Sequence, residues 1–295
     1  MSLTLYPFVK YSKVLIEVIP FGGSIDNIGL TYFARDELAK SIQIGCLVEV
    51  PFRNTIDYAI VTNTESREIP ENPKSIVRIV TSIPLLAPYQ IQSIFDSSSY
   101  YFVHTHHILS LFLSKTLVRY LEKKDFIALL PQISSKRKNT STILGFYHHT
   151  SDVPFFQAIQ EHIKGNTVVV FPDDFSIEAY LRTYPLDSET TLVIPDKLTE
   201  TKKYKAFCSV YNGEKNIIIG TRRILYYNLS HYENILYIED SLHKSAMRFG
   251  HTYKHLEILR KMAPQSNCNI TILSTLPSIE SMYLLHTGVY RGIKH

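Results

Sequence analysis

Cysteine is scarce in this 295-residue chain, and its spacing excludes two classes of protein. The three cysteines, Cys46, Cys208 and Cys268, lie far apart and include no Cys-x-x-Cys pair. Such spacing gives neither a disulfide framework nor a zinc site. The sequence therefore predicts a protein of a reducing compartment, and we expect the cytoplasm.

Long apolar runs and a large excess of one charge are also lacking. No stretch of about 18 apolar residues occurs, and the first residues carry no basic segment followed by an apolar core. We therefore expect a protein that is neither secreted nor bound to a membrane. The net charge is only +4, from 31 basic and 27 acidic residues, which allows a polyanionic partner without requiring one.

The hydrophobic content of 45% and charged content of 20% are ordinary for a globular chain of about two domains. Short apolar segments bounded by turn residues predict strands at 13–21, 45–52 and 57–63. Apolar residues with helical spacing predict helices at 89–105 and 108–131. Residues 1–131 are thus expected to form a small β-rich domain closed by helices.

A polar, basic stretch at 132–142 predicts a linker, and the pattern changes after it. Between 143 and 295, apolar strand segments alternate with helical segments, which predicts an α/β domain with βαβ units around a parallel sheet. The expected strands are 167–171, 190–194, 216–220, 234–238 and 269–273. The expected helices are 154–164, 174–184, 198–211, 251–262 and 278–287.

Motifs in both halves resemble those of one family, the primosomal replication-restart helicases (primosomal protein N′). In the second half, "IIIGTRR" resembles the family's "GTR" DNA-contact motif, "YIEDSLH" its "DEEH" box, and "STLPSIES" its "SATPSLES" motif. In the first half, "GSIDN", "GCLVEVPFRNTIDYAIV" and "NPKSIVRIVTSIPLLAP" resemble its 3′-end DNA-binding domain. The resemblance implies that domain at 1–131 and a RecA-like, P-loop NTPase-like lobe at 143–295. It also implies DNA and other replication-restart proteins as partners.

The resemblance assigns a 3′-end site to Ile25, Asp26, Asn27, Arg53 and Lys74. Asp26 matches the acid that meets the terminal hydroxyl, although an Asx-turn residue would look the same. Ile25 and Asn27 replace aromatic residues, which weakens base stacking. Arg53 replaces a glycine, and Lys74 matches a pocket lysine or is a solvated loop charge.

In the second half, Arg222 and Arg223 match residues that contact the DNA backbone. Arginines at a helix start that face solvent are the alternative. The histidines of "HTHH" (104–107) suggest a metal site, but adjacent histidines are expected to point apart, and no acid or cysteine lies at ligand spacing. We therefore predict no metal.

The same comparison predicts a degenerate nucleotide site at Gly145, Glu239 and Asp240. A P-loop needs glycines, a lysine and a Ser or Thr to hold phosphates and Mg²⁺. Gly145 is expected near the start of that loop, but no Gly-Lys-Thr occurs. Glu239 stands where the family has its Mg²⁺-binding Asp, and Asp240 stands where it has its catalytic Glu. We therefore expect no catalysis and no cofactor.

The leading hypothesis is a non-catalytic DNA-binding protein that recognises forked DNA or a 3′ end. It is strengthened by the lack of the family's zinc module and second motor lobe, although a piece of a longer protein would look the same. One alternative is a residual nucleotide-dependent enzyme in which Glu239 and Asp240 still bind Mg²⁺·ATP. Another is a protein-interaction scaffold without DNA affinity, which the small net charge allows.

Overall fold

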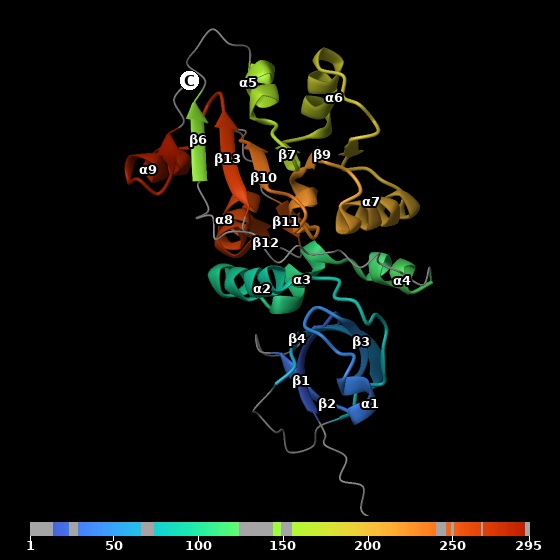
Figure 1. Cartoon of the computed structure of the whole chain (residues 1–295). Helices are drawn as coiled ribbons and strands as arrows, with labels where there is room; N and C mark the ends of the chain where they lie inside the picture. The colour runs from blue at the N-terminus through green and yellow to red at the C-terminus, as the bar shows by residue number, and fades with distance from the viewer. Residues whose placement is uncertain are drawn as a thin grey trace, which may run out of the picture. The chain divides into compact units, whose positions relative to one another are not determined.

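The computed structural model describes residues 14–23, 29–65, 74–123, 144–148, 155–239, 246–248, 251–266 and 268–292. The chain divides into two compact units (Figure 1). The first unit comprises Met1–Ile91 and Val103–Leu109, and the second comprises Gln92–Phe102 and Ser110–His295. The predicted linker at 132–142 lies outside the described residues, and the predicted domain boundaries stay predictions.

The first unit contains a five-stranded antiparallel sheet in the order β2-β1-β4-β3-β5. The strands β1, β3 and β4 confirm the three predicted ones, whereas β2, β5 and the short helix α1 were not predicted. The bounds are β1 Val14–Pro20, β2 Leu30–Ala34, α1 Asp36–Ala39, β3 Leu47–Phe52, β4 Thr55–Asn63 and β5 Arg78–Ile79. Alternate residues of these strands face a common apolar core that includes Ile16, Val18, Val48, Val50 and Val61.

Residues 74–79 close this sheet on itself. Phe33 in β2 donates its amide hydrogen to the carbonyl of Lys74 at 2.9 Å and accepts from the amide of Ile76 at 2.9 Å. A few residues later, β5 pairs with β3. The segment therefore joins both edges of the sheet, so that the backbone groups at those edges pair within the unit.

Three helices follow the sheet in the chain: α2 Pro88–Tyr101, α3 Thr105–Phe112 and α4 Lys115–Lys123. The first confirms the helix predicted at 89–105, although it ends at Tyr101, before Phe102 with its positive φ of 52°. The single helix predicted at 108–131 is wrong within the described residues. It is broken at residues 113–114, where the Ser114 hydroxyl accepts a hydrogen bond from the Leu117 amide and so caps a new helix.

The second unit contains a seven-stranded sheet in the order β14-β6-β13-β10-β7-β9-β8, and every pairing in it is parallel. This confirms the predicted α/β domain with a parallel sheet. The strands are β6 Leu144–His148, β7 Thr167–Phe171, β8 Thr191–Ile194, β9 Ile217–Thr221, β10 Asn234–Ile238, β13 Asn269–Ser274 and β14 Arg291–Gly292. The strand β6 and the two-residue strand β14 were not predicted.

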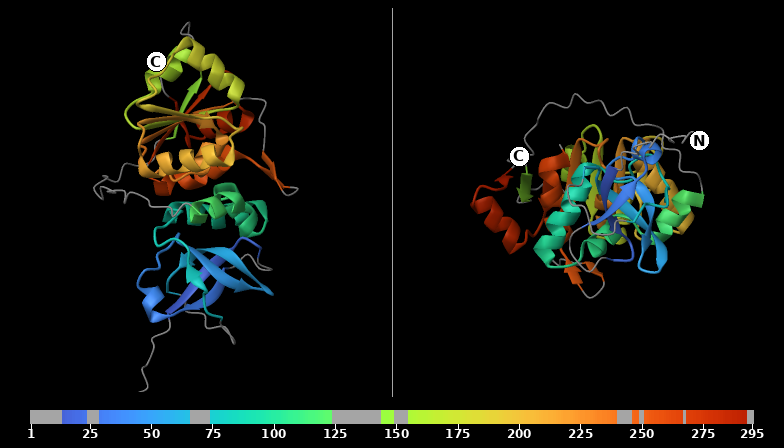
Figure 2. Two further views of the ribbon diagram at one scale, coloured as in Figure 1. Left: turned by 90° about the vertical axis from the view of Figure 1, so that its right-hand side faces the viewer. Right: turned by 90° about the horizontal axis from the view of Figure 1, so that it is seen from below.

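Helices cover both faces of this sheet (Figure 2). Val169 and Phe171 of β7 pack on the side of α5 and α6, whereas Val168 and Val170 pack on the side of α7 and α8. A strand buried on both faces needs a continuous apolar run, and "TVVVF" supplies it. The helical elements are α5 Phe155–His162, α6 Asp174–Thr183, α7 Glu200–Asn212, the 3₁₀-helix η1 Arg222–Tyr226, α8 His255–Ser266 and α9 Ile279–His286.

Side-chain caps fix the helix starts that follow the carboxyl ends of β7, β8 and β13. The side chains of Asp173, Thr199 and Ser278 accept hydrogen bonds from amides in the first turns of α6, α7 and α9. These helix N-termini therefore lie at the edge of the sheet where parallel α/β proteins bind ligands.

The helix predicted at 251–262 begins later than expected. Residues His251–Tyr253 form strand β12, which pairs with β11 (Ala246–Arg248) in an antiparallel ribbon, and α8 starts at His255. Among the described residues, none of the helices has the length and apolar character needed to cross a membrane.

Gly45, just before β3, allows a close approach of two backbone segments. Its φ is +91°, and a Cβ built on it would lie 2.0 Å from the carbonyl oxygen of Leu86. We expect Gly45→Ala to lower the free energy of unfolding by about 3 kcal/mol, because it combines a left-handed backbone with overpacking. Urea denaturation followed by circular dichroism measures the change.

Gly288→Ala is the matched control. Gly288 also has a positive φ, of +76°, but nothing lies within 4 Å of its built Cβ. The control should lose only about 1 kcal/mol. Equal losses in the two variants would show that the contact with Leu86 is unimportant.

Candidate nucleic-acid interface and buried carboxylate

The β3–β4 hairpin presents an exposed arginine. Phe52 pairs with Thr55, so Arg53 and Asn54 form a two-residue loop, and Arg53 has a φ of 53°. Such loops favour glycine at this position, and another residue there costs about 1 kcal/mol. The Arg53 guanidinium lies 5.2 Å from the centroid of the Phe52 ring. Arg53 therefore places a cation on a strained turn, and strained backbone positions are common at functional sites.

The Gly22–Gly23 turn lies beside the same hairpin. A Cβ at Gly22 would lie 2.5 Å from a carboxylate oxygen of Asp57 and 3.1 Å from the Phe52 ring. Gly23 has a φ of +92°, and a Cβ there would lie 3.0 Å from the His106 ring. The backbone of Gly22 and Gly23 therefore packs directly against the rings of Phe52 and His106 and the carboxylate of Asp57. The predicted Ile25, Asp26 and Asn27 come directly after this turn but lie outside the described residues.

The histidines of "HTHH" contact one another, so the expectation that they point apart is wrong. The ring centroids of His106 and His107 are 4.1 Å apart, and those of His104 and His106 are 5.7 Å apart. Thr105 starts α3, so His104 precedes the helix and its ring can reach those in the first turn. No group of acids, histidines or cysteines in the described part of the chain could hold a metal ion.

Lys74 lies on the surface of the first unit. Its main-chain carbonyl accepts a hydrogen bond from the Phe33 amide. Its side chain forms no hydrogen bond or ion pair with the described residues. The structure therefore shows an exposed cation at Lys74 but does not join it to the Arg53 hairpin. Sequence reasoning missed Phe52, Asp57 and His106, which surround the turn; only their spatial proximity marks them.

The two predicted arginines of the second unit have different surroundings. Arg223 is exposed at the start of η1, and its Nε lies 3.6 Å from Oδ1 of Asp196. The Thr221 hydroxyl donates to the same carboxylate oxygen, and the amide of Asp196 donates to Asp174 at 2.9 Å. The solvent-facing alternative therefore holds for Arg223, which remains accessible to phosphate.

Arg222, in contrast, is buried and lines a cavity of about 40 Å³ together with Lys254, His255 and Glu257. Burial, and then the Arg222 charge, lower the pKa of His255 to about 4, so its ring is neutral at neutral pH. The Tyr226 hydroxyl lies 2.7 Å from Nδ1 of His255. The cavity has room for a few water molecules and not for a nucleotide.

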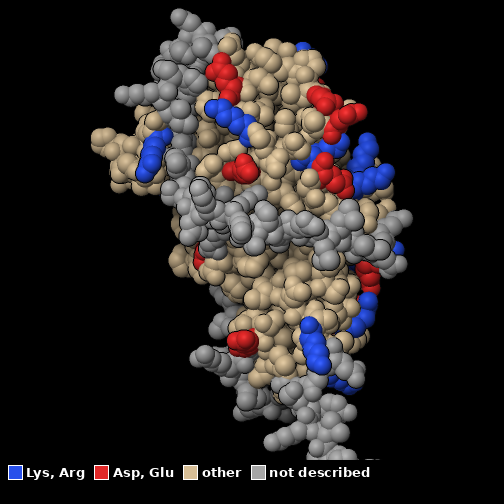
Figure 3. Space-filling view, viewed as in Figure 1, with Lys and Arg blue, Asp and Glu red and all other residues tan. Residues whose placement is uncertain are grey.

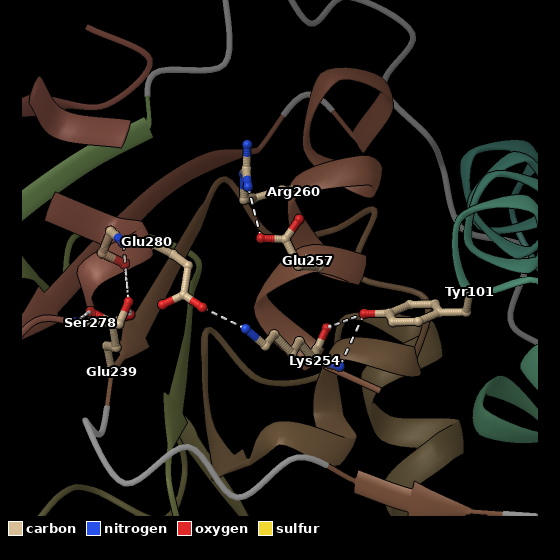
Figure 4. Close-up of polar contacts among 8 residues, drawn as sticks. Tyr101, Glu239, Lys254, Glu257, Arg260, Ser278 and Glu280 are labelled. Carbon is tan, nitrogen blue, oxygen red and sulfur yellow. Dashed lines mark hydrogen bonds and ion pairs between the residues drawn. The ribbon is translucent and has the colours of Figure 1, made fainter. Parts of the chain in front are cut away.

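Glu239 is buried at the carboxyl end of β10, and α9 binds its carboxylate (Figure 4). The hydroxyls of Ser278 and Ser281 donate to Oε1 at 2.8 and 2.6 Å, and the Ser278 amide donates to Oε2 at 3.4 Å. A helix N-terminus favours a negative charge at this position. The carboxylate is therefore part of the packing of α9 onto the sheet.

A separate set of ion pairs and hydrogen bonds lies at the start of α8 and in its first turns (Figure 4). The Lys254 ammonium donates to Glu280 at 2.6 Å, and Arg260 donates to Glu257 at 2.8 Å. The Tyr101 hydroxyl accepts from the Lys254 amide at 3.0 Å and donates to the Lys254 carbonyl at 3.3 Å. Lys254, the residue before α8, is therefore bound by Glu280 through its side chain and by Tyr101 through its main chain.

Gly145 lies inside β6, opposite Thr271 of β13 and Arg291 of β14. The strand continues to His148, three residues beyond Gly145, and the expectation that Gly145 stands near the start of a phosphate-binding loop stays a prediction. Residues 149–154, which follow this strand, and Asp240 lie outside the described residues. The predicted nucleotide site of Gly145, Glu239 and Asp240 therefore stays a prediction.

Comparison with known proteins identifies the first part of the chain. Residues 24–114 match the family model of the PriA 3′DNA-binding domain (3′BD). This part is therefore similar to the PriA 3′DNA-binding domain. The match covers less than a third of the chain and includes the positions of all five residues predicted for the 3′-end site. A search of curated proteins finds no match.

Among solved structures, the chain is similar to one described as "Structure of RecG bound to three-way DNA junction". The sequence identity is 15% and the TM-score is 0.33. The similarity covers 61% of this chain and 23% of that one. The chain thus spans less than a quarter of that protein.

We expect Glu239→Ala to lower the free energy of unfolding by about 3 kcal/mol, because it leaves the Ser278 and Ser281 hydroxyls without their acceptor. Glu280→Ala is the control, since its carboxylate is exposed and its ion pair with Lys254 contributes at most about 1 kcal/mol. Thermal unfolding with and without Mg²⁺ measures the stability of both variants and of the unmutated protein. Wild-type stability in Glu239→Ala, together with stabilisation of the unmutated protein by Mg²⁺, would identify a metal ligand instead.

Proposed function

We propose that this protein is a non-catalytic DNA-binding protein that recognises the 3′ end of a strand on forked DNA. The observation that carries the proposal is the match of residues 24–114 to the PriA 3′DNA-binding domain. We further propose that the second unit is a degenerate RecA-like lobe. It would support DNA binding without hydrolysing ATP.

The surroundings of the Gly22–Gly23 turn support recognition of a strand end. The rings of Phe52 and His106 pack against this turn and are partly exposed, so they offer surfaces on which a base can stack. Arg53 adds an exposed cation for phosphate on the same hairpin. This turn leads directly to Asp26, which the proposal assigns to the terminal hydroxyl.

The surroundings of Glu239 support the absence of catalysis. Phosphoryl transfer depends on a carboxylate that positions Mg²⁺ at the phosphates. Here both oxygens of the corresponding carboxylate accept hydrogen bonds from α9, and the side chain is only 4% exposed. Oε1 already accepts two hydrogen bonds, so a metal that binds this oxygen would displace the hydroxyl of Ser278 or Ser281. The sequence, moreover, has no lysine between Lys138 and Lys164 to take the place of a P-loop lysine.

The first test compares forked DNA carrying a recessed 3′-hydroxyl with the same fork carrying a 3′-phosphate. Fluorescence anisotropy should show about tenfold weaker binding to the phosphorylated fork, because the phosphate brings a second anion to Asp26. Asp26→Ala should remove the difference. Equal affinity of the unmutated protein for both forks would contradict recognition of the end.

Lys74→Ala and Arg53→Gly are the matched variants for this experiment. Each removes one exposed cation from the first unit without changing Asp26. Both should weaken binding to the two forks alike, as the loss of a phosphate contact does. Loss of discrimination in Lys74→Ala would assign the terminal hydroxyl to that residue instead.

The second test concerns ATP. The purified protein should release no phosphate from ATP when forked DNA is added, because the carboxylate of Glu239 is bound by α9. Release that DNA stimulates and that Asp240→Asn abolishes would contradict the proposal. Asp240→Asn is preferred to a change at Glu239, since Glu239→Ala is expected to destabilise the fold.

A further inference from the structure

Helix α4 carries a regular stripe of cations on one side. Lys115, Arg119 and Lys123 are spaced by four residues, so their exposed side chains follow one line along two turns of the helix. The opposite side packs inward through Leu117, Val118 and Leu121. Like charges four residues apart destabilise a helix. The stripe therefore opposes the stability of α4, which favours a role in binding an anion.

Helix α7 contacts α4 and extends this basic surface. The Tyr120 hydroxyl lies 2.8 Å from the Thr201 hydroxyl, and the Tyr120 and Tyr204 ring centroids are 5.5 Å apart. Lys205 lies one turn beyond Thr201, on the side of α7 that meets α4, and Lys202 lies three residues before Lys205. We call the exposed cations Lys115, Arg119, Lys123, Lys202 and Lys205 the α4–α7 basic face.

Most cations of this face lack a partner among the described residues, unlike Lys203 of the same helix α7, which pairs with Glu200. Arg119, Lys123, Lys202 and Lys205 form no hydrogen bond or ion pair with the described residues through their side chains. Elsewhere in the unit, acidic side chains pair with cations: Arg182 with Glu178, Lys254 with Glu280 and Arg260 with Glu257. Figure 3 shows Lys and Arg side chains gathered at the edge of the unit where α7 lies, with a few acids among them.

The chemistry of the face selects the type of partner. No large apolar side chain of α4 or α7 is among the exposed ones in the described part of the chain. A protein interface would need apolar or aromatic anchors at its centre. The α4–α7 basic face instead offers ammonium and guanidinium donors with hydroxyls between them, as a phosphate backbone requires.

We infer that the α4–α7 basic face binds the phosphate backbone of a duplex DNA arm. The stripe on α4 is about 12 Å long. A duplex presents about one negative charge per 1.7 Å of its axis, so several phosphates lie within that length. The inference rests on the proposed function, and it adds a second contact surface that is independent of the 3′ end. Such contacts give affinity and orientation without sequence preference.

The experiment measures the affinity of the full chain for a fork and for a blunt duplex at several salt concentrations. Arg119→Gln/Lys123→Gln should reduce the slope of log K against log salt by about 2, at about 0.9 per phosphate contact. Adding Lys202→Gln and Lys205→Gln should reduce it by about 4 in total. The preference for a 3′-hydroxyl should persist in both variants.

Lys164→Gln/Arg182→Gln is the matched control, since it removes two exposed cations of the second unit that lie outside α4 and α7. The control should keep the wild-type slope and affinity. An unchanged slope in the α4 variant, in a protein that binds forks, would overturn the inference and leave the proposed function intact. A wild-type protein that binds neither DNA at low salt would overturn both.

Discussion

The contact of the buried Glu239 carboxylate with α9 is the constraint on which the carboxyl edge of the second unit depends. The main chain of Glu239 is fixed between β10 and β13, since its amide donates to Leu273 and its carbonyl accepts from the Ser274 hydroxyl. Its side chain then receives the hydroxyls of Ser278 and Ser281. A charge buried in this way is stable only while these donors remain in place. At the carboxyl end of β10, where parallel sheets usually bind a ligand, Ser278 and Ser281 therefore occupy the Glu239 carboxylate.

This constraint separates the roles of the two units. Most of the match to a 3′DNA-binding domain lies in the first unit, whose strained arginine hairpin and glycine turn are the features that we propose bind a strand end. The second unit contains a parallel sheet covered by helices on both faces, and Glu239 at the carboxyl end of β10 contacts α9. The exposed cations of the second unit, at Arg223 and on the α4–α7 basic face, are the groups that we propose contact DNA. These external surfaces do not depend on the Glu239 contact, because they consist of exposed side chains and the helices that carry them.

The sequence predicted those parts of the fold whose signal is local. The run "TVVVF" specifies a strand buried on both faces, and the alternation that follows specifies a parallel sheet. The short strands β2, β5 and β14 were missed because their pairing partners, not their residues, define them. Apolar spacing continues across the break before Leu117, so a single helix was predicted there. The position of Arg53 at a turn was evident, but its positive φ was not. The role of Glu239 depends on serines 39 and 42 residues away, and no local pattern reveals that contact.

Hydrogen exchange of the full chain, followed by mass spectrometry, tests the central claim most directly. Amide protection reports which segments become ordered or covered when a ligand binds. The protein would be measured alone, with a fork carrying a recessed 3′-hydroxyl, and with Mg²⁺·ATP. The account predicts that the fork slows exchange in the β3–β4 hairpin and in helices α4 and α7, and that Mg²⁺·ATP changes nothing at Glu239 or at the start of α9. Protection of these last segments by Mg²⁺·ATP, with none of the hairpin by the fork, would contradict it.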